Sequence, residues 1–201
     1  MKILLVDDHV MVIEALAQMV RKYFPRAQIS TAADRAAALS FLKANEDCDA
    51  LVSDLSFHGK MDGYAIVKEV SSKYPEIGVV VLSMHDEHAF VRKALVEGAR
   101  GYIVKTDPPE EICRAIESVV AGKTYLSSSL NAKKIGELES SAQELSAREQ
   151  EIAQLVKSGA SSKVIGEKLS ISPRTVEVHR RNLMRKLEVH NTAQLVALLN
   201  K

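Results

Sequence analysis

Five short aliphatic runs alternate with longer amphipathic segments, and this alternation constrains the fold more than any other feature of the sequence. The runs lie at residues 3–6, 27–31, 50–53, 79–82 and 101–104. Segments with helical periodicity lie between and after them, near residues 10–23, 33–44, 62–73, 87–97 and 109–121. Short continuous apolar runs are typical of strands buried on both faces of a sheet. Five strand–helix units predict an α/β fold with a doubly wound, five-stranded parallel sheet.

The last of these helices has the clearest boundaries in the sequence. Asp107 is a candidate N-cap, and Pro108 suits the first helical position. Ile112 and Ile116 belong to an apolar stripe that runs until Gly122. We therefore expect the α/β domain to end shortly after this helix.

The rest of the chain changes character and predicts a second domain. A polar, serine-rich stretch follows the last α/β helix and has room for a short helix over residues 131–138. Beyond it the sequence has no strand signal, and residues 192–200 form a last, largely apolar helical segment. We predict an α/β domain at 1–124, a linker at 125–142 and a small all-α domain of four helices at 143–201.

Serine side chains mark the starts of three of those four helices. Ser146 and Glu149 have the spacing of a capping box, in which each side chain accepts a hydrogen bond from the other residue's backbone amide. Ser161 precedes the second apolar segment, and Ser172 with Pro173 is a strong start signal for the third. This third helix, joined to the second by a short turn, predicts a helix-turn-helix arrangement.

Charge is distributed unevenly between the two parts of the chain. Residues 1–126 carry 15 basic and 18 acidic side chains, whereas residues 127–201 carry 12 basic and 8 acidic ones. Five basic residues fall close together in the predicted third helix of the second part: Arg174, Arg180, Arg181, Arg185 and Lys186. An acidic first domain and a basic second domain suggest different partners, with a polyanion for the second.

Several other classes of protein are disfavoured. The chain has 2 cysteines, Cys48 and Cys113, too far apart for a zinc finger and too few for a disulfide scaffold. The longest purely aliphatic runs have four residues, so we expect no membrane span, and the first of them meets Asp7 and Asp8 where a signal peptide would continue apolar. We expect a cytoplasmic protein.

Charged and hydroxyl side chains stand at the carboxyl ends of four predicted strands: Asp7 and Asp8, Asp54, Ser83, and Lys105. In an open parallel sheet these ends share one edge, where ligands bind next to the point at which strand order reverses. Three carboxylates at one edge would repel one another, and Mg²⁺, which prefers oxygen ligands, removes that conflict. Lys105 and Ser83 suit the oxygens of a phosphoryl group, so Asp54 is the candidate nucleophile. For Asp8 taken alone, the simpler interpretation is an N-cap of the following helix.

Residues 1–122 resemble the receiver domain of two-component response regulators. The resemblance is carried by KILLVDDH, ALVSDL, VVVLSMHD and GYIVKTDPPEEICRAI. It implies that Asp54 accepts a phosphoryl group from a sensor histidine kinase, that Asp8, Asp54 and the backbone carbonyl of Ser56 hold Mg²⁺, and that Asp7 supports this site. It also implies that Ser83 and Lys105 contact the phosphoryl oxygens and that Tyr102 is a switch aromatic that turns inward.

The loop after Asp54 departs from the family pattern. Residues 55–63 read LSFHGKMDG, with no proline and with one residue more than usual before Gly63. Since proline would have fixed φ, we expect a longer and less preset loop. His58 and His85 lie near this edge of the sheet, but imidazole suits softer transition ions, and we expect no third histidine to join them. We expect Mg²⁺ binding to survive.

The segment 173–187 separates into two faces on a helical wheel. Val176, Leu183 and Leu187 form a buried stripe, and Val178 and Arg181 lie among basic residues on the opposite face. Arginine can read guanine, and valine can contact the methyl group of thymine, so this face suits the major groove of DNA. The alternative is a solvated charged surface on an interaction module. His179 is expected to be packed against protein.

Residues 145–189 resemble the LuxR-type helix-turn-helix of the NarL/FixJ regulators, with Ser162 and Glu177 as departures. The resemblance implies double-stranded promoter DNA as a partner, with Glu177, Val178 and Arg181 nearest the bases. Residues expected to face phosphates are Lys163, Arg174, Thr175, Arg185 and Lys186. It also implies a homodimer on activation through Leu195, Val196 and Leu199, and contact with RNA polymerase is a further expectation.

The sequence thus predicts a DNA-binding response regulator with no enzymatic turnover. Two other functions remain open at this point. One is a transcription regulator that acts without phosphorylation, which the irregular loop at 56–61 would suit. The other is a Mg²⁺-dependent phosphohydrolase with an aspartate nucleophile, against which Ser56 stands where such an enzyme would carry a second general acid.

Overall fold

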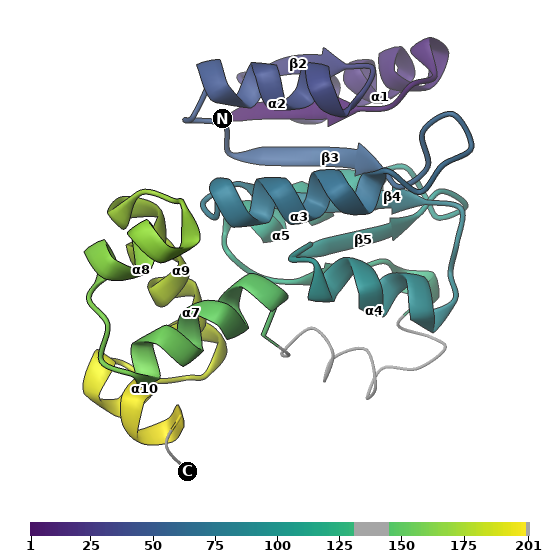
Figure 1. The fold of residues 1–201 in the computed structure, drawn as a ribbon. Helices are drawn as coiled ribbons and strands as arrows, with labels where there is room; N and C mark the ends of the chain where they lie inside the picture. Colours follow the sequence, from purple (N-terminus) through teal and green to yellow (C-terminus); the bar gives the residue numbers. More distant parts are fainter. Residues whose placement is uncertain (131–144, 200–201) are drawn as a thin grey trace.

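The computed structural model describes residues 1–130 and 145–199 as an α/β domain followed by a group of helices (Figure 1). The strands are β1 Lys2–Val6, β2 Gln28–Ala32, β3 Ala50–Asp54, β4 Gly78–Ser83, β5 Gly101–Val104 and β6 Tyr125–Leu126. The helices of the first domain are α1 Val10–Tyr23, α2 Arg35–Ala44, α3 Gly63–Lys73, α4 His88–Val96 and α5 Glu110–Val120. Those of the second are α7 Ala147–Lys157, α8 Ser162–Leu169, α9 Pro173–Lys186 and α10 Thr192–Leu199.

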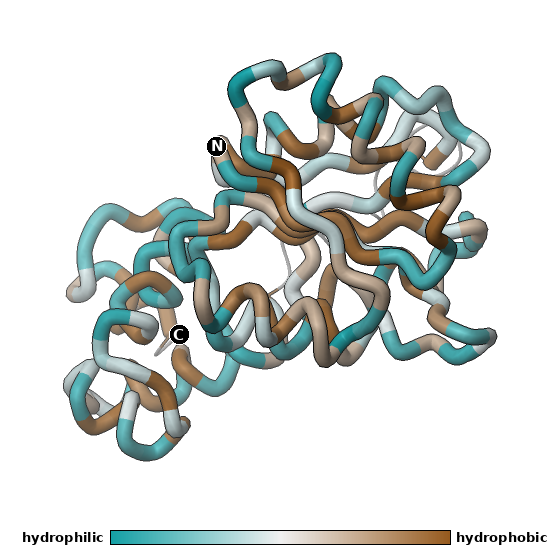
Figure 2. The backbone as a smooth tube through the Cα atoms, turned by 90° about the horizontal axis from the view of Figure 1, so that it is seen from above, coloured by the Kyte–Doolittle hydropathy of each residue, from teal (hydrophilic) through white to brown (hydrophobic). Residues whose placement is uncertain are grey.

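All strands of the sheet are parallel, in the order β2-β1-β3-β4-β5-β6. Strand order reverses between β1 and β3, which are direct neighbours and whose carboxyl ends therefore flank the crevice where ligands bind in such sheets. Helices α1 and α5 cover one face of the sheet, and α2, α3 and α4 cover the other. The apolar strands run through the middle of the domain, between more hydrophilic helices (Figure 2).

The sheet has six strands, whereas the sequence predicted five. Tyr125 and Leu126 pair with Gly101 and Tyr102, so the first two residues of the predicted linker belong to the sheet. A strand of two residues is too short to produce a recognisable periodicity. Residues 131–142 of the predicted linker, including the short helix expected at 131–138, lie outside the described residues.

The predicted start of α5 was wrong by about two residues. The helix begins at Glu110 after Pro109, and the Asp107 carboxylate caps nothing: it accepts a hydrogen bond from the Ser129 hydroxyl at 2.8 Å. Asp107 thereby ties the entrance of the helix to the segment after β6. The apolar stripe with Ile112 and Ile116 is buried, as expected.

The second domain is built as the serine signals predicted. Ser146 and Glu149 form a capping box, and Ser161 and Ser172 each accept a hydrogen bond from an amide in the first turn of α8 and α9. Such caps stabilise a helix by about 1 kcal/mol each. The helices pack around a small apolar core to which α9 contributes Val176 and Leu183. Among the described residues no helix is long and apolar enough to span a bilayer.

Candidate functional site

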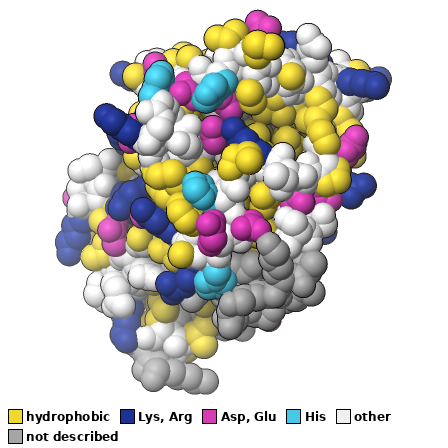
Figure 3. Space-filling view, turned by 90° about the vertical axis from the view of Figure 1, so that its right-hand side faces the viewer, with side chains coloured by type: hydrophobic (Ala, Val, Ile, Leu, Met, Phe, Trp, Pro, Cys, Tyr) yellow, Lys and Arg dark blue, Asp and Glu magenta, His cyan; other side chains and the backbone are white. Residues whose placement is uncertain are grey.

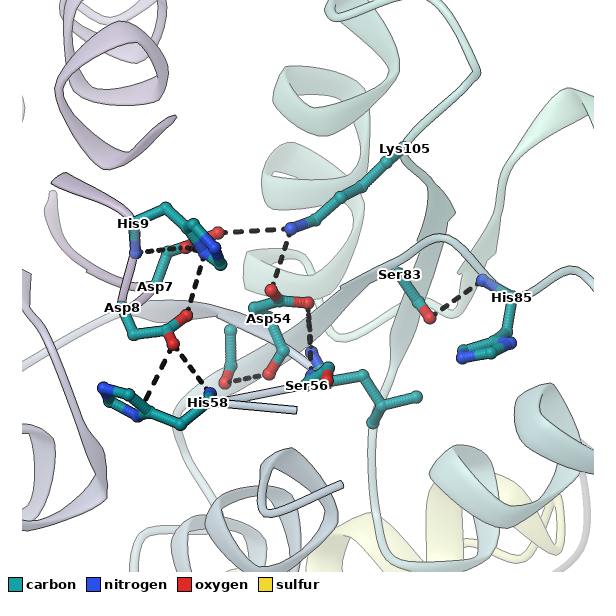
Figure 4. A network of polar contacts seen from close by, with 11 residues as sticks. Asp7, Asp8, His9, Asp54, Ser56, His58, Ser83, His85 and Lys105 are labelled. Carbon is teal, nitrogen blue, oxygen red and sulfur yellow. Dashed lines mark hydrogen bonds and ion pairs between the residues drawn. The ribbon is translucent and has the colours of Figure 1, made fainter. Parts of the chain in front are cut away.

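The carboxylates at the ends of β1 and β3 meet, as the topology requires. Asp7, Asp8 and Asp54 have side chains that are only 2%, 7% and 7% exposed. Together with His9 they offer ligand atoms that all lie within 4.8 Å of one another. Figure 4 shows this cluster with Lys105 above it and Ser83 on the far side of Asp54 from Asp8. Figure 3 shows the face at the carboxyl ends of the strands, where acidic, basic and histidine side chains gather.

Lys105 connects the carboxylates of two strands. Its Nζ atom lies 2.8 Å from Asp54 Oδ2 and 3.2 Å from Asp7 Oδ2. Burial would favour the neutral amine, but the two carboxylates outweigh it and raise the pKa of Lys105. Lys105 is therefore a fixed cation beside the candidate nucleophile.

One cation does not satisfy three carboxylates. Asp8 Oδ1 is buried and accepts no hydrogen bond from any residue that the structure describes, although the exposed His9 imidazole lies 3.0 Å away; Asp8 Oδ2 accepts from the His58 amide at 2.7 Å. Burial opposes the ionised form of Asp8, yet this amide and the nearby imidazoles outweigh it, and the pKa of Asp8 is lowered. A buried, ionised carboxylate with an unsatisfied oxygen is the chemistry of a divalent cation site.

The Asp54 carboxylate is positioned by the backbone that follows it. Its Oδ1 accepts hydrogen bonds from the amides of Leu55 at 2.6 Å and Ser56 at 3.3 Å, and its Oδ2 faces Lys105. The amide of Ser56 thus lies at the site, next to the carbonyl that the sequence assigned to the metal. Hydrogen-bond donors therefore contact both oxygens of the candidate nucleophile and fix its orientation.

Ser83 and Tyr102 are linked through His85. The His85 amide donates to the Ser83 hydroxyl at 3.1 Å, and the Tyr102 hydroxyl donates to the His85 carbonyl at 2.8 Å. Tyr102 is fully buried, and this burial raises the pKa of its phenol. The His85 ring stacks on Phe90 with centroids 4.2 Å apart. The switch aromatic of the sequence prediction therefore occupies the inward position.

The lengthened loop after Asp54 is an ordered turn. Phe57 and Lys60 exchange two backbone hydrogen bonds of 2.8 Å, and the two residues between them, His58 and Gly59, have φ of 48° and 73°. Positive φ at both central positions is characteristic of a type I′ hairpin turn. The extra residue is absorbed in this turn, which brings the His58 amide to Asp8.

Gly63 is required by the close approach of α3 to Asp54. A Cβ atom at this position would lie 2.4 Å from the Asp54 carbonyl oxygen and 2.5 Å from Leu55 Cα. We expect Gly63→Ala to destabilise the chain by about 1–3 kcal/mol because backbone must move to admit the methyl group. Thermal unfolding followed by circular dichroism measures this loss. Lys60→Ala, an exposed change in the same loop, is the control, and equal melting of both variants would contradict the proposed close packing.

The basic helix α9 lies against the α/β domain at the amino ends of the strands, opposite the carboxylates (Figure 1). His179 Nε2 contacts the Ser72 carbonyl at 2.8 Å, and Asn182 Nδ2 donates to the Pro75 carbonyl at 3.1 Å. Arg181 pairs with Glu76 at 3.1 Å. His179 is 3% exposed, in agreement with its predicted packing.

Docking of α9 changes the exposure expected from the helical wheel. Val178 was expected on the exposed face, but it is 6% exposed and lines an interdomain cleft of about 770 Å³ with Tyr74 and Pro75. Other residues predicted to contact DNA remain at the surface: Lys163, Arg174, Glu177, Arg181 and Arg185 are exposed, and Thr175 is half-buried. In this arrangement Val178 is not free to contact a base.

Lys186 forms an ion pair inside its own domain. Its Nζ atom lies 2.8 Å from Glu149 Oε2, and the Glu149 side chain is 8% exposed. Burial would raise the pKa of Glu149, but Lys186 and the capping bonds from Ser146 outweigh it, and the pKa is lowered. The sequence assigned Lys186 to a DNA phosphate, whereas here its ammonium group neutralises a buried carboxylate.

The residues expected to pair two chains are only partly at the surface. Leu195 is fully buried in the core of its own domain, and Val196 and Leu199 are half-buried against that core. Leu198, which the sequence prediction left out, is 40% exposed on the same helix. A second chain docking on α10 would therefore meet Leu198 before Leu195.

His9 is the site residue that sequence reasoning missed. It precedes α1 directly, and its Nδ1 atom lies 3.0 Å from Asp8 Oδ1 and 3.1 Å from Asp7 Oδ1. The sequence does not show that a histidine before a helix belongs to the site, because its ring could equally turn to solvent. Only its place directly after two aspartates could have suggested it.

Comparison with known protein families matches both halves of the chain. The family described as response regulator receiver domain matches residues 3–117, and the luxR family of bacterial regulatory proteins matches residues 143–199. The oxygen regulatory protein NreC of Staphylococcus epidermidis is 31% identical over 208 residues, covering 98% of this chain and 95% of NreC. NreC of Staphylococcus aureus is also 31% identical, with the same coverage.

Solved structures give the same result. A two-component response regulator of the LuxR family from Aurantimonas sp. superposes with a TM-score of 0.62 at 29% identity, covering 69% of this chain and 97% of that one. The response regulator RcsB in complex with DNA superposes with a TM-score of 0.55 at 25% identity, covering 100% of this chain and 98% of RcsB. The present chain belongs to the response regulators that join a receiver domain to a LuxR-type DNA-binding domain.

Proposed function

We propose that the chain is a phosphorylation-dependent transcription regulator of the cytoplasm, in which Asp54 accepts a phosphoryl group from a sensor histidine kinase. The observation that carries this proposal is the position of Asp54 between Lys105 and the backbone amides, at the edge of the sheet where strand order reverses between β1 and β3. Asp54 Oδ attacks the phosphorus, and the bond to the donor's nitrogen or oxygen breaks as the new P–O bond forms.

The surrounding residues have separate tasks in this proposal. Lys105 binds the Asp54 carboxylate before the transfer and a phosphoryl oxygen after it. The Ser83 hydroxyl donates a hydrogen bond to another phosphoryl oxygen. Mg²⁺ fits the unsatisfied oxygen of Asp8, and Asp7, Asp8, Asp54 and the Ser56 carbonyl would hold it, offsetting the charge of carboxylates and phosphoryl group. Tyr102 and His85 follow any movement of Ser83 because hydrogen bonds join them.

Strands β4 and β5 connect this site to the DNA-binding domain, because each has its carboxyl end at the site and its amino end near α9. β4 ends at Ser83 and begins just after Pro75, and β5 ends before Lys105 and begins after Arg100. Arg100 donates to the same Pro75 carbonyl as Asn182, at 2.7 Å. We propose that a change at the carboxyl ends shifts these strands and releases α9 to bind promoter DNA as a homodimer.

Labelling stoichiometry tests whether the site is a receiver or a phosphohydrolase. Incubation with acetyl phosphate and Mg²⁺ is expected to produce one acid-stable, base-labile phosphoryl group per chain and a single turnover. Sustained release of phosphate from a small ester over many turnovers would instead favour the phosphohydrolase. Phosphate measured continuously and intact mass measured in parallel separate the two.

Arg181 is expected to contribute to the choice of DNA sequence. It is exposed on α9, and its only partner among the described residues is the exposed carboxylate of Glu76. Arg181→Ala should reduce discrimination between the preferred site and single-base variants by about 1–3 kcal/mol at one position. The loss of discrimination is measured as binding to a panel of such duplexes at fixed salt. Lys168→Ala, at an exposed position on α8, is the control. Unchanged discrimination would show that α9 enters the groove in another orientation.

A further inference from the structure

The two departures from the LuxR-type pattern, Ser162 and Glu177, contact each other across the helix-turn-helix. Ser162 is the first residue of α8, and Glu177 lies in the amino-terminal half of α9. The Ser162 hydroxyl donates a hydrogen bond to Glu177 Oε1. The two departures therefore form one structural unit on the DNA-binding domain.

Arg180 fixes this pair from one turn further along α9. Its Nη1 atom donates to the Ser162 hydroxyl oxygen at 3.0 Å and lies 3.9 Å from Glu177 Oε1. Its Nη2 atom donates to Thr192 Oγ1, at the start of α10, at 3.2 Å. The Arg180 side chain is 15% exposed, so its guanidinium group is held between three helices. The Glu177 carboxylate consequently has a set orientation on α9.

These contacts use only one of the two oxygens of the Glu177 carboxylate. Among the described residues none donates a hydrogen bond to Oε2, and the Glu177 side chain is 63% exposed. Val178 and Arg181 are covered by or paired with the first domain, whereas the contacts of Glu177 lie within its own domain. A carboxylate with one oxygen held and the other open is preorganised to accept a hydrogen bond from a ligand.

An ionised carboxylate can only accept hydrogen bonds, and this restricts the base that it can read. In the major groove cytosine presents the N4 amino donor, guanine presents two acceptors, thymine an acceptor and a methyl group, and adenine a donor beside an acceptor. We propose that Glu177 selects a cytosine in the promoter site, with Ser162 and Arg180 as positioning residues for its carboxylate. The inference rests on the DNA-binding step of the proposed function but not on phosphoryl transfer.

Selection from random duplexes by the full chain, followed by anisotropy with single-base variants of the selected site at fixed salt, tests the base preference. We expect one position at which cytosine binds about fivefold or more tightly than any other base. Glu177→Gln should remove this preference or shift it to adenine, to which an amide can bond through N6 and N7. It should also tighten binding to all other duplexes, because a negative charge leaves the phosphate backbone. Glu167→Gln, an equal change of charge at an exposed position of α8, is the matched control and should keep the cytosine preference.

Ser162→Ala tests the positioning role separately. Loss of the hydroxyl group should reduce the cytosine preference by about 2- to 10-fold and leave the affinity for random-sequence DNA unchanged. Ser162→Thr, which keeps a hydroxyl group, should restore the preference. A merely structural role of Ser162 would lower the affinity for all duplexes alike.

Three results would overturn the inference: a selected site at which Glu177→Gln changes no base preference, equal losses of preference in Glu177→Gln and Glu167→Gln, or weaker binding of Glu177→Gln to every duplex. The affinities are measured with and without acetyl phosphate. A response to the donor without the cytosine preference overturns this inference alone. The expected variant pattern in a chain whose affinity does not respond to the donor supports the inference and overturns the dependence on phosphorylation.

Discussion

Replacing Asp54 with asparagine is expected to abolish labelling of the chain by acetyl phosphate. The amide of asparagine has no anionic oxygen to attack phosphorus, although it can still accept the hydrogen bond from the Leu55 amide. The variant should fold, because Lys105 keeps Asp7 as a partner and the substitution leaves no additional buried charge unpaired. Intact mass spectrometry after incubation with the donor measures the loss.

Asp62→Asn is the matched control for this variant. Asp62 is exposed at the start of α3, and its side chain makes no capping hydrogen bond. It should be labelled as fully as the unaltered chain. Full labelling of Asp54→Asn would place the phosphoryl group elsewhere and refute the assignment, and weak labelling of Asp62→Asn would show that the loop itself is required.

Substituting His179 with alanine is expected to raise the DNA affinity of the unphosphorylated chain. His179 is buried between the domains and contacts the Ser72 carbonyl, so its removal leaves that carbonyl without this partner. Such a loss costs about 1–3 kcal/mol, and each 1.4 kcal/mol changes an equilibrium constant about tenfold. If docking of α9 limits DNA binding, the apparent affinity should rise by a similar factor, of about 5- to 100-fold.

Fluorescence anisotropy with a duplex selected for binding measures this change. Glu76→Gln is the control, because it removes only the ion pair with Arg181, in which the two side chains are 66% and 57% exposed. Exposed pairs contribute about 1 kcal/mol at most, so the control should bind DNA within about fivefold of the unaltered chain. An unchanged or weaker affinity in His179→Ala, with an unchanged melting temperature, would contradict the inhibitory role of docking.

Lowering the pH should raise the DNA affinity of the unphosphorylated chain, as His179→Ala does. Burial is the main cause that lowers the pKa of His179 below its usual 6.5, against the opposing effects of the Ser72 carbonyl and Glu149. The undocked state therefore takes up a proton more readily than the docked state. Docking is fully stable above about pH 6.5 and weakens as the pH falls through the lowered pKa. The affinity difference between the unaltered chain and His179→Ala should shrink over that range.

The acidic site could be predicted because topology alone brings its residues together. Asp7, Asp54, Ser83 and Lys105 each follow an apolar run, and the carboxyl ends of parallel strands share one edge. What the sequence could not supply was local geometry. The turn at His58 and Gly59 needs positive φ at a histidine, which no pattern of hydrophobicity encodes.

The helices of the second domain could be predicted from the sequence, but the surface that packs against the first domain could not. Serine caps and apolar spacing located α7, α8 and α9 because those signals act within a few residues of one another. Burial of Val178 and His179 depends on the last residues of α3 and the loop after it, residues 72–76, about a hundred positions earlier in the chain. A helical wheel separates polar from apolar faces but does not show which polar face another domain will cover.

The affinity of the full chain for a selected promoter duplex, with and without acetyl phosphate, tests the central claim most directly. Asp54→Asn is measured beside the unaltered chain at the same salt and Mg²⁺ concentration. The account predicts that the donor tightens binding of the unaltered chain by about 5- to 100-fold and leaves Asp54→Asn unchanged. Equal affinity with and without the donor, in a chain whose mass confirms full labelling, would contradict it and indicate a regulator that binds DNA independently of phosphorylation.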